Sequence, residues 1–176
     1  MMRFVLVTAA ILLGATAVVA QQDIAEQQDK LMKTLARPMY GVLGRTVRGQ
    51  SAYDQAAIDA ALVQLEENVG KIANVFASNP KEDVFGADYG SSQKIWQNKA
   101  DFDSKIPPVT KAIADAKGKI KDADSLKAAY TTINDRCNDC HETYRVKLKR
   151  RLDFVQFRQM TTGRSRSSDP PHFGVR

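Results

Sequence analysis

Two cysteines and a histidine near the end of the chain form the motif with the most specific chemistry. Cys137 and Cys140 are three positions apart and His141 follows directly, which is the C-x-x-C-H spacing of c-type haem attachment. On a helix, positions i, i+3 and i+4 share one face, so both thiols can reach the two vinyl groups of one porphyrin. The imidazole can then point at the iron. The motif predicts one covalently bound haem c, with two thioethers and His141 as an axial ligand.

Three other interpretations compete with haem attachment. A disulfide across one helical turn closes almost no loop and would add little stability. A thioredoxin-like redox pair needs a βαβ context and a helix N-terminus, whereas this pair lies late in an expected helix. A zinc site lacks ligands, because His141 and His172 are the only histidines and there is no second cysteine pair. Haem attachment is favoured over all three.

Apolar residues at intervals of three and four predict the helices that would position this motif. No strand-like alternation extends beyond a few residues. The expected helices cover about 24–47, 54–77, 91–118 and 124–149. Pro38 should kink the first, and Pro107-Pro108 should bend or break the third. Four helices with short connections predict an all-α fold, an antiparallel up-down four-helix bundle that can hold the haem between its helices.

The length of 176 residues fits one domain with short extra segments. Residues 1–20 have the pattern of a signal peptide, because Arg3 precedes an uncharged apolar run and Val18-x-Ala20 offers small residues for cleavage. The run is shorter than the roughly 20 residues that span a bilayer, and no basic cluster follows it. We therefore expect cleavage after Ala20, export to the bacterial periplasm, no remaining membrane span, and a cytochrome-type domain over 21–149.

The formal net charge of +6 comes mainly from the end of the chain. Residues 146–176 hold eight basic and two acidic side chains, whereas residues 21–145 hold 17 basic and 18 acidic ones. The near-neutral body gives no sign of nucleic-acid binding. Residues 150–176, rich in Ser, Arg and Pro, are predicted to be a basic, disordered tail.

The surroundings of the motif resemble the class II cytochromes c, which include the cytochromes c′ and the low-spin cytochromes c-556. The resemblance covers about 21–147 and rests on the following segments: Cys137-x-x-Cys140-His141-x-x-Tyr144-Arg145, Lys94-Ile95-Trp96 with Phe102, and Leu31-Met32-Lys33. It implies a left-handed bundle with haem packed near one end, Arg145 near the proximal imidazole and Trp96 in the pocket wall. Gln28 departs from the pattern, since many cytochromes c′ carry an arginine there.

Met32 separates two functions that the sequence leaves open. The resemblance to the cytochromes c-556 implies that Met32 is the sixth iron ligand, and a His/Met haem without a vacant position suits an electron carrier. The alternative is a five-coordinate protein of the cytochrome c′ type that binds nitric oxide or carbon monoxide. Met39 is a rival ligand, but it lies seven residues on, about 10 Å along the helix.

No catalytic constellation accompanies the haem motif. The body has no second histidine, no G-x-S-x-G and no Gly-rich phosphate loop. We therefore expect a protein that is not an enzyme. Its expected partners are redox proteins, with no nucleic acid, and self-association as a homodimer is left open.

Overall fold

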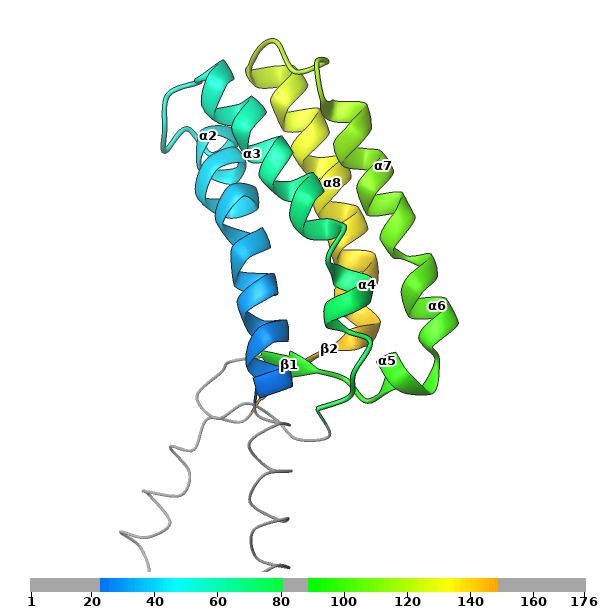
Figure 1. Cartoon of the computed structure of the whole chain (residues 1–176). Helices are drawn as coiled ribbons and strands as arrows, with labels where there is room; N and C mark the ends of the chain where they lie inside the picture. Colours follow the sequence, from blue (N-terminus) through cyan, green and yellow to red (C-terminus); the bar gives the residue numbers. More distant parts are fainter. Residues whose placement is uncertain (1–22, 81–88, 149–176) are drawn as a thin grey trace, which may run out of the picture.

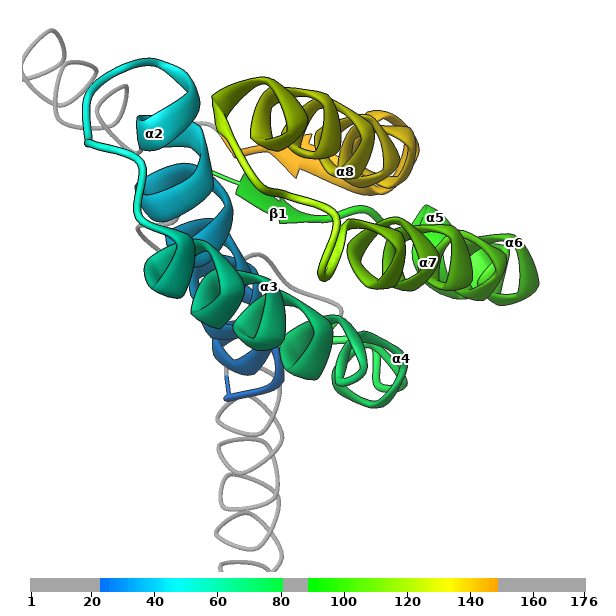
Figure 2. The same ribbon diagram turned by 90° about the horizontal axis from the view of Figure 1, so that it is seen from above.

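The computed structural model describes residues 23–80 and 89–148. The predicted signal peptide over 1–20 and the predicted tail over 150–176 lie outside these residues. The described helices run up and down in an antiparallel four-helix bundle, which confirms the predicted fold class (Figure 1; Figure 2, from above). None of these helices is long and apolar enough to cross a membrane.

The first helix changes its winding at the predicted kink. It is α-helical over 23–36, continues as the π-helix η1 (Arg37–Leu43) and ends as α2 (Gly44–Val47). Pro38 has no N–H to donate and crowds the preceding turn, and the Gly44 N–H donates to the Met39 carbonyl, five residues back. A wider turn thus absorbs the proline while the helix continues.

The second and third helices are broken into segments. The second consists of α3 (Gln55–Val69) and α4 (Ile72–Val75), and the Asp54 side chain caps α3 by accepting from the Ala57 N–H at 3.2 Å. The third consists of α5 (Lys94–Gln97), α6 (Lys99–Ser104) and α7 (Ile106–Ala116). Pro107 and Pro108 lie in the first turn of α7, where their missing N–H groups are tolerated. They therefore mark the break that the sequence predicts.

The fourth helix, α8 (Ala123–Tyr144), is continuous and carries the motif in its last two turns. It begins with a capping box, in which Asp122 accepts from the Ser125 N–H at 2.8 Å and the Ser125 hydroxyl accepts in return from the Asp122 N–H. After α8 the chain forms β2 (Arg145–Lys147), which pairs antiparallel with β1 (Tyr89–Ser91). This two-stranded ribbon was not predicted, because three residues per strand leave no period to detect.

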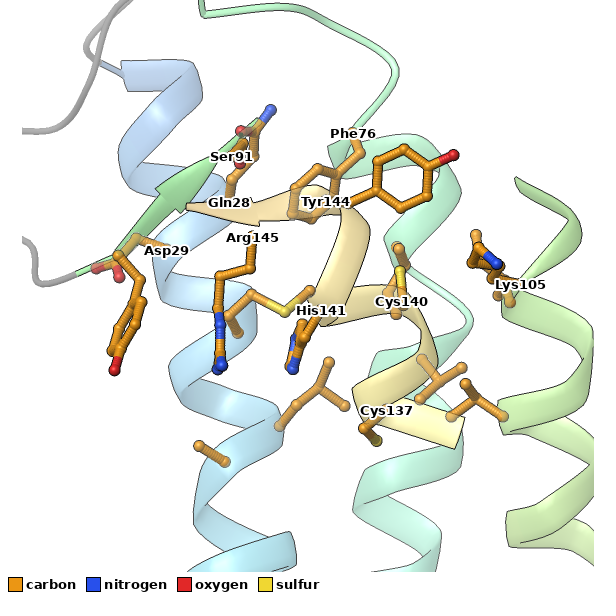
Figure 3. A pocket seen from close by; sticks show the side chains of 18 of the residues that line it. Gln28, Asp29, Phe76, Ser91, Lys105, Cys137, Cys140, His141, Tyr144 and Arg145 are labelled. Carbon is orange, nitrogen blue, oxygen red and sulfur yellow. Dashed lines mark hydrogen bonds between the residues drawn. The ribbon is translucent and has the colours of Figure 1, made fainter. Parts of the chain in front are cut away.

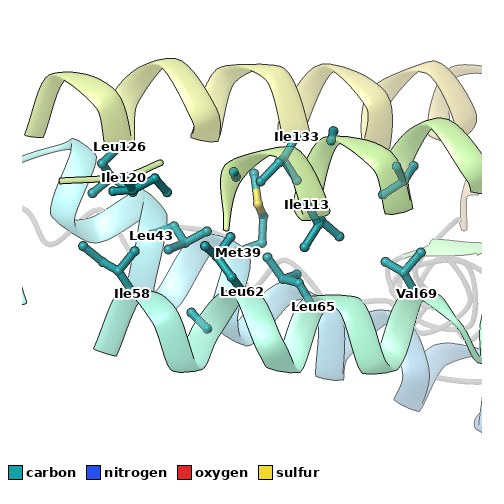
Figure 4. Close-up of a cluster of buried hydrophobic side chains, with 14 residues drawn as sticks. Met39, Leu43, Ile58, Leu62, Leu65, Val69, Ile113, Ile120, Leu126 and Ile133 are labelled. Atoms are coloured by element: carbon teal, nitrogen blue, oxygen red, sulfur yellow. The ribbon is translucent and has the colours of Figure 1, made fainter. Parts of the chain in front are cut away.

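The buried side chains form two clusters. The larger, here called the aliphatic cluster, is drawn in Figure 4 and consists of Met39, Leu43, Ile58, Ala61, Leu62, Leu65, Val69, Val109, Ala112, Ile113, Ala116, Ile120, Leu126 and Ile133. The smaller, here called the aromatic cluster, consists of Leu31, Phe76, Ile95, Phe102 and Tyr144. The aliphatic cluster joins all four helices, so it fixes the frame on which the motif is held.

Candidate functional site

A cavity of about 410 Å³ lies inside the bundle, and both clusters contribute to its wall. Its size is typical of a cofactor pocket. The lining is mainly apolar, and the charged side chains that line it in the described part of the chain are Asp29, Lys33, Lys105 and Arg145. Figure 3 shows several lining side chains that converge from different helices.

All three residues of the haem motif line this cavity from α8. Cys137 and Cys140 are half-buried and unpaired with each other, and His141 lies beside them (Figure 3). Burial, with a smaller contribution from Cys140, raises the pKa of the Cys137 thiol to about 11. Burial likewise raises the pKa of Cys140 to about 11. A thioredoxin-like pair needs a lowered thiol pKa, so these protonated thiols disfavour that interpretation.

The His141 imidazole is the polar group in the cavity wall that lacks a partner. Its Nδ1 atom is buried and makes no hydrogen bond, the one such side-chain atom in the described residues. Burial lowers the pKa of His141, and the charge of Arg145 lowers it further. Both effects favour the neutral imidazole, which is the form that ligates a metal. No group of three or more His, Cys, Asp or Glu in the described residues could hold a bare metal ion.

Two methionines of the first helix also line the cavity, in different surroundings. Met39 is 3% exposed and belongs to the aliphatic cluster. Met32 is half-buried and packs against the aromatic cluster, as Cys140 does. Met32 therefore shares the motif's end of the cavity, whereas Met39 is committed to the packed core.

The structure separates the two further residues that the resemblance placed in the pocket. Arg145 lines the cavity. Trp96 does not: its indole N–H donates to the Phe76 carbonyl at 3.1 Å, and its ring packs against the aromatic cluster. A place for Trp96 in the wall of the haem pocket stays a prediction, since α5 turns this side chain toward the end of α4 and against the aromatic cluster, whose side chains border the cavity.

Gln28 links the first helix to two other segments of the chain through hydrogen bonds. It is 2% exposed, its Oε1 accepts from the Ser91 hydroxyl at 2.9 Å, and its Nε2 donates to the Ser78 carbonyl at 3.0 Å. Lys105 and Tyr89 are lining residues that sequence reasoning missed. Their positions depend on the break before α7 and on the β-ribbon, so no local pattern could have revealed them.

The comparisons with known proteins agree with this site. A family model described as Cytochrome C′ matches residues 23–145. Cytochrome c-555 of Bradyrhizobium diazoefficiens is 60% identical over 149 residues, covering 85% of this chain and all of that one. Cytochrome c-556 of Rhodopseudomonas palustris is 46% identical, covering 84% of this chain and 99% of the relative.

A solved structure gives the same result. An NMR-validated model of oxidised R. palustris cytochrome c556 superposes with a TM-score of 0.62 at 42% identity and covers 73% of this chain and 99% of that one. The chain therefore belongs to the cytochrome c′ family, and that membership confirms haem c, with its iron, as the expected cofactor.

Proposed function

We propose that this chain is a periplasmic electron-transfer protein whose haem iron is ligated by His141 and Met32. Cys137 and Cys140 would attach the haem through thioethers. The observation that carries the proposal is the cavity itself, which the unpaired imidazole of His141 and the thioether of Met32 both line, from different helices. This donor set fits haem c, since a neutral imidazole and a soft thioether are both haem ligands.

When bound, the haem supplies one-electron chemistry. The chain's own residues hold and shield it. Apolar side chains of both clusters line the cavity and would keep water from a bound haem, and a methionine ligand favours the reduced iron. If His141 and Met32 both bind the iron, an incoming diatomic gas would find no vacant site, so this pair of ligands would suit an electron carrier and not the gas-binding alternative.

Met32 is a better candidate than Met39 for a structural reason. Met39 is nearly inaccessible within the aliphatic cluster, so using it as a ligand would disrupt packing that four helices share. Met32 already lies at the end of the cavity that holds Cys140. The resemblance to the low-spin cytochromes c-556, together with the relatives named c-555 and c-556, also favours this residue.

The test is spectroscopic. The purified wild-type protein should be low-spin by absorption and electron paramagnetic resonance. Met32→Ala should become high-spin and bind carbon monoxide when reduced. The matched control, Met39→Ala, should lose stability and stay low-spin. A wild-type protein that is already high-spin would move the chain to the gas-binding class.

The covalent attachment has its own test. Acid–acetone extraction should leave the haem on the wild-type polypeptide, because a thioether does not dissociate. Changing Cys137 and Cys140 together to Ser should release it. Wild-type protein that loses all its haem in this extraction would overturn the attachment, whatever its spin state.

A further inference from the structure

The β-ribbon brings an arginine and a tyrosine together at the edge of the cavity. In its register Ser91 pairs with Arg145 and Tyr89 pairs with Lys147, so Tyr89 and Arg145 are diagonal neighbours on one face. The guanidinium carbon of Arg145 lies 4.6 Å from the centre of the Tyr89 ring, within the range of a cation–π contact. Both residues line the cavity. The ring therefore holds the charged group at the cavity edge.

Arg145 has no carboxylate partner in the described residues. Two other cations line the cavity, and each is near an acid: Lys33 pairs with Asp29 at 2.6 Å, and Lys105 lies 3.9 Å from Asp101. No ion pair within 23–80 and 89–148 involves Arg145. Its guanidinium is thus available to an anion that enters the cavity.

Arg145 lies on the side of His141 opposite to Cys140, which is the side where the propionates of an attached haem would be expected. Figure 3 shows Cys140, His141 and Arg145 in that order across the cavity. In a haem, the two propionates are on the edge opposite the vinyl groups, with the iron between. If Cys137 and Cys140 hold the vinyl edge and His141 the iron, the propionate edge extends toward Arg145.

We propose that Arg145, positioned by Tyr89, binds a propionate carboxylate of the haem. The proposal rests on the covalent attachment proposed above, and it holds for either spin state. A guanidinium can bind a carboxylate through two parallel hydrogen bonds, and a carboxylate beside a mainly apolar cavity needs such a partner. Gln28 cannot replace it, because it is neutral and both ends of its amide are already hydrogen-bonded.

This pairing predicts how the reduction potential depends on the two residues. The guanidinium offsets the negative charge of the propionate, and an unpaired negative charge near the iron stabilises the ferric state. Arg145→Gln should therefore lower the potential of the loaded protein. Arg145→Lys should lower it less, because it keeps the charge and loses the two-pronged geometry.

The experiment compares four variants of the holoprotein: Arg145→Gln, Arg145→Lys, Tyr89→Leu and Tyr89→Phe. Reduction potentials are measured together with the proton NMR signals of the propionate methylenes in the ferric state. Arg145→Gln should shift both. Tyr89→Leu, which removes the ring, should shift both in the same direction by less, and Tyr89→Phe, which keeps the ring, should match the wild type. Tyr89 is 47% exposed, so these variants should fold.

Two results would overturn the assignment. One is a changed potential in Arg145→Gln with unmoved propionate signals, which would mean that the arginine acts on His141 alone. The other is an Arg145→Gln protein identical to the wild type in both measurements. Failure of the wild type to retain haem in the extraction test would instead refute the proposed attachment, so the two failures are distinguishable.

Discussion

The two ends of the bundle are stabilised in different ways. Around the aliphatic cluster the helices are long, and much of the cluster is closed by packing between side chains of the chain itself, with Leu43, Leu62 and Leu126 fully buried. Around the aromatic cluster the elements are short: α4 and α5 have four residues each, and the β-ribbon has three per strand. The first region is filled mainly by its own side chains, whereas the second borders the cavity where the haem is expected.

The region around the aromatic cluster is held by specific ring contacts and hydrogen bonds, whereas the aliphatic cluster is held mainly by close packing. Phe102 contacts Phe76 and Tyr144 with ring centres 5.5 and 5.2 Å away. The Tyr144 hydroxyl donates to the Asp101 carboxylate at 2.5 Å, and the Tyr144 carbonyl accepts from the Ser92 N–H. These contacts fix the last turn of α8, which carries Cys140 and His141, against segments far away in the sequence.

The largest effect should follow removal of the haem. At ~24 cal/mol per Å³, keeping a cavity of about 410 Å³ open and empty would cost on the order of 10 kcal/mol, so the segments around it should collapse or open instead of keeping this shape. The haem-free variant with Cys137 and Cys140 changed to Ser should therefore loosen around the cavity. Amide hydrogen exchange in α5, α6 and the last turn of α8 should rise more than tenfold, while the middle of α3 stays protected. Uniform exchange across both ends would contradict the comparison.

The second-largest effect should come from shortening a buried side chain of the aliphatic cluster. Leu62 is fully buried and does not line the cavity, so Leu62→Ala should lower the free energy of unfolding by about 2–5 kcal/mol. The haem spectrum should not change. Leu35→Ala is the matched variant, since Leu35 is half-buried and lines the cavity. It should cost less stability and alter the spectrum. Denaturant titrations and absorption spectra of both holoproteins test this, and a reversal of the two patterns would refute it.

Tyr144→Phe should have an intermediate effect. It removes a hydrogen bond to a charged acceptor, of the kind worth about 1.5–3 kcal/mol, but the Asp101 side chain is 45% exposed, so water can replace part of it. We expect a loss of about 1–2 kcal/mol at neutral pH, measured by denaturant unfolding, with the ring packing retained. No loss would show that the hydroxyl contributes nothing to this end of the bundle.

The same variant should change the alkaline behaviour. The hydrogen bond to Asp101, together with burial, raises the pKa of Tyr144 from 10.0 to about 12. A raised pKa in the folded state stabilises the protein below the unfolded value, and this contribution is lost as pH rises through the folded value. The difference in stability between wild type and variant should therefore narrow between pH 10 and 12.

The smallest effect should come from an exposed ion pair between two of the helices that carry the aliphatic cluster. Lys117, at the end of α7, pairs with Glu66 of α3, and both side chains are more than a third exposed. Exposed pairs contribute about 0–1 kcal/mol, so Lys117→Met should change the free energy of unfolding by less than ~1 kcal/mol. High salt should abolish even that difference. A larger loss of unfolding free energy that does not depend on salt would mean that the region around the aliphatic cluster also depends on polar interactions.

The same contrast explains what the sequence could predict. The aliphatic cluster comes from periodic runs, so Ile58, Leu62 and Leu65 could be identified from their spacing alone. The C-x-x-C-H motif on α8 could likewise be recognised, because it consists of consecutive residues. The position of Trp96 could not be predicted, because it depends on how the short α5 turns, and the contact between Tyr89 and Arg145 depends on pairing between segments more than 50 residues apart. The predicted signal peptide and tail remain predictions.

The π-helix η1 fixes how the first helix is rotated relative to α2. Each residue of an α-helix advances by about 100°, and a π turn holds one residue more than an α turn. Deleting one residue within 37–43 would therefore restore ordinary winding and keep residues 23–36 in register with α2. Inserting one residue without a further wide turn would instead rotate residues 23–36 by about 100°, and Met32 would leave the cavity wall although no residue of the site had been changed. Gly41→Ala adds a methyl group where there is open space, so this stretch should accept substitutions and one deletion and reject insertions.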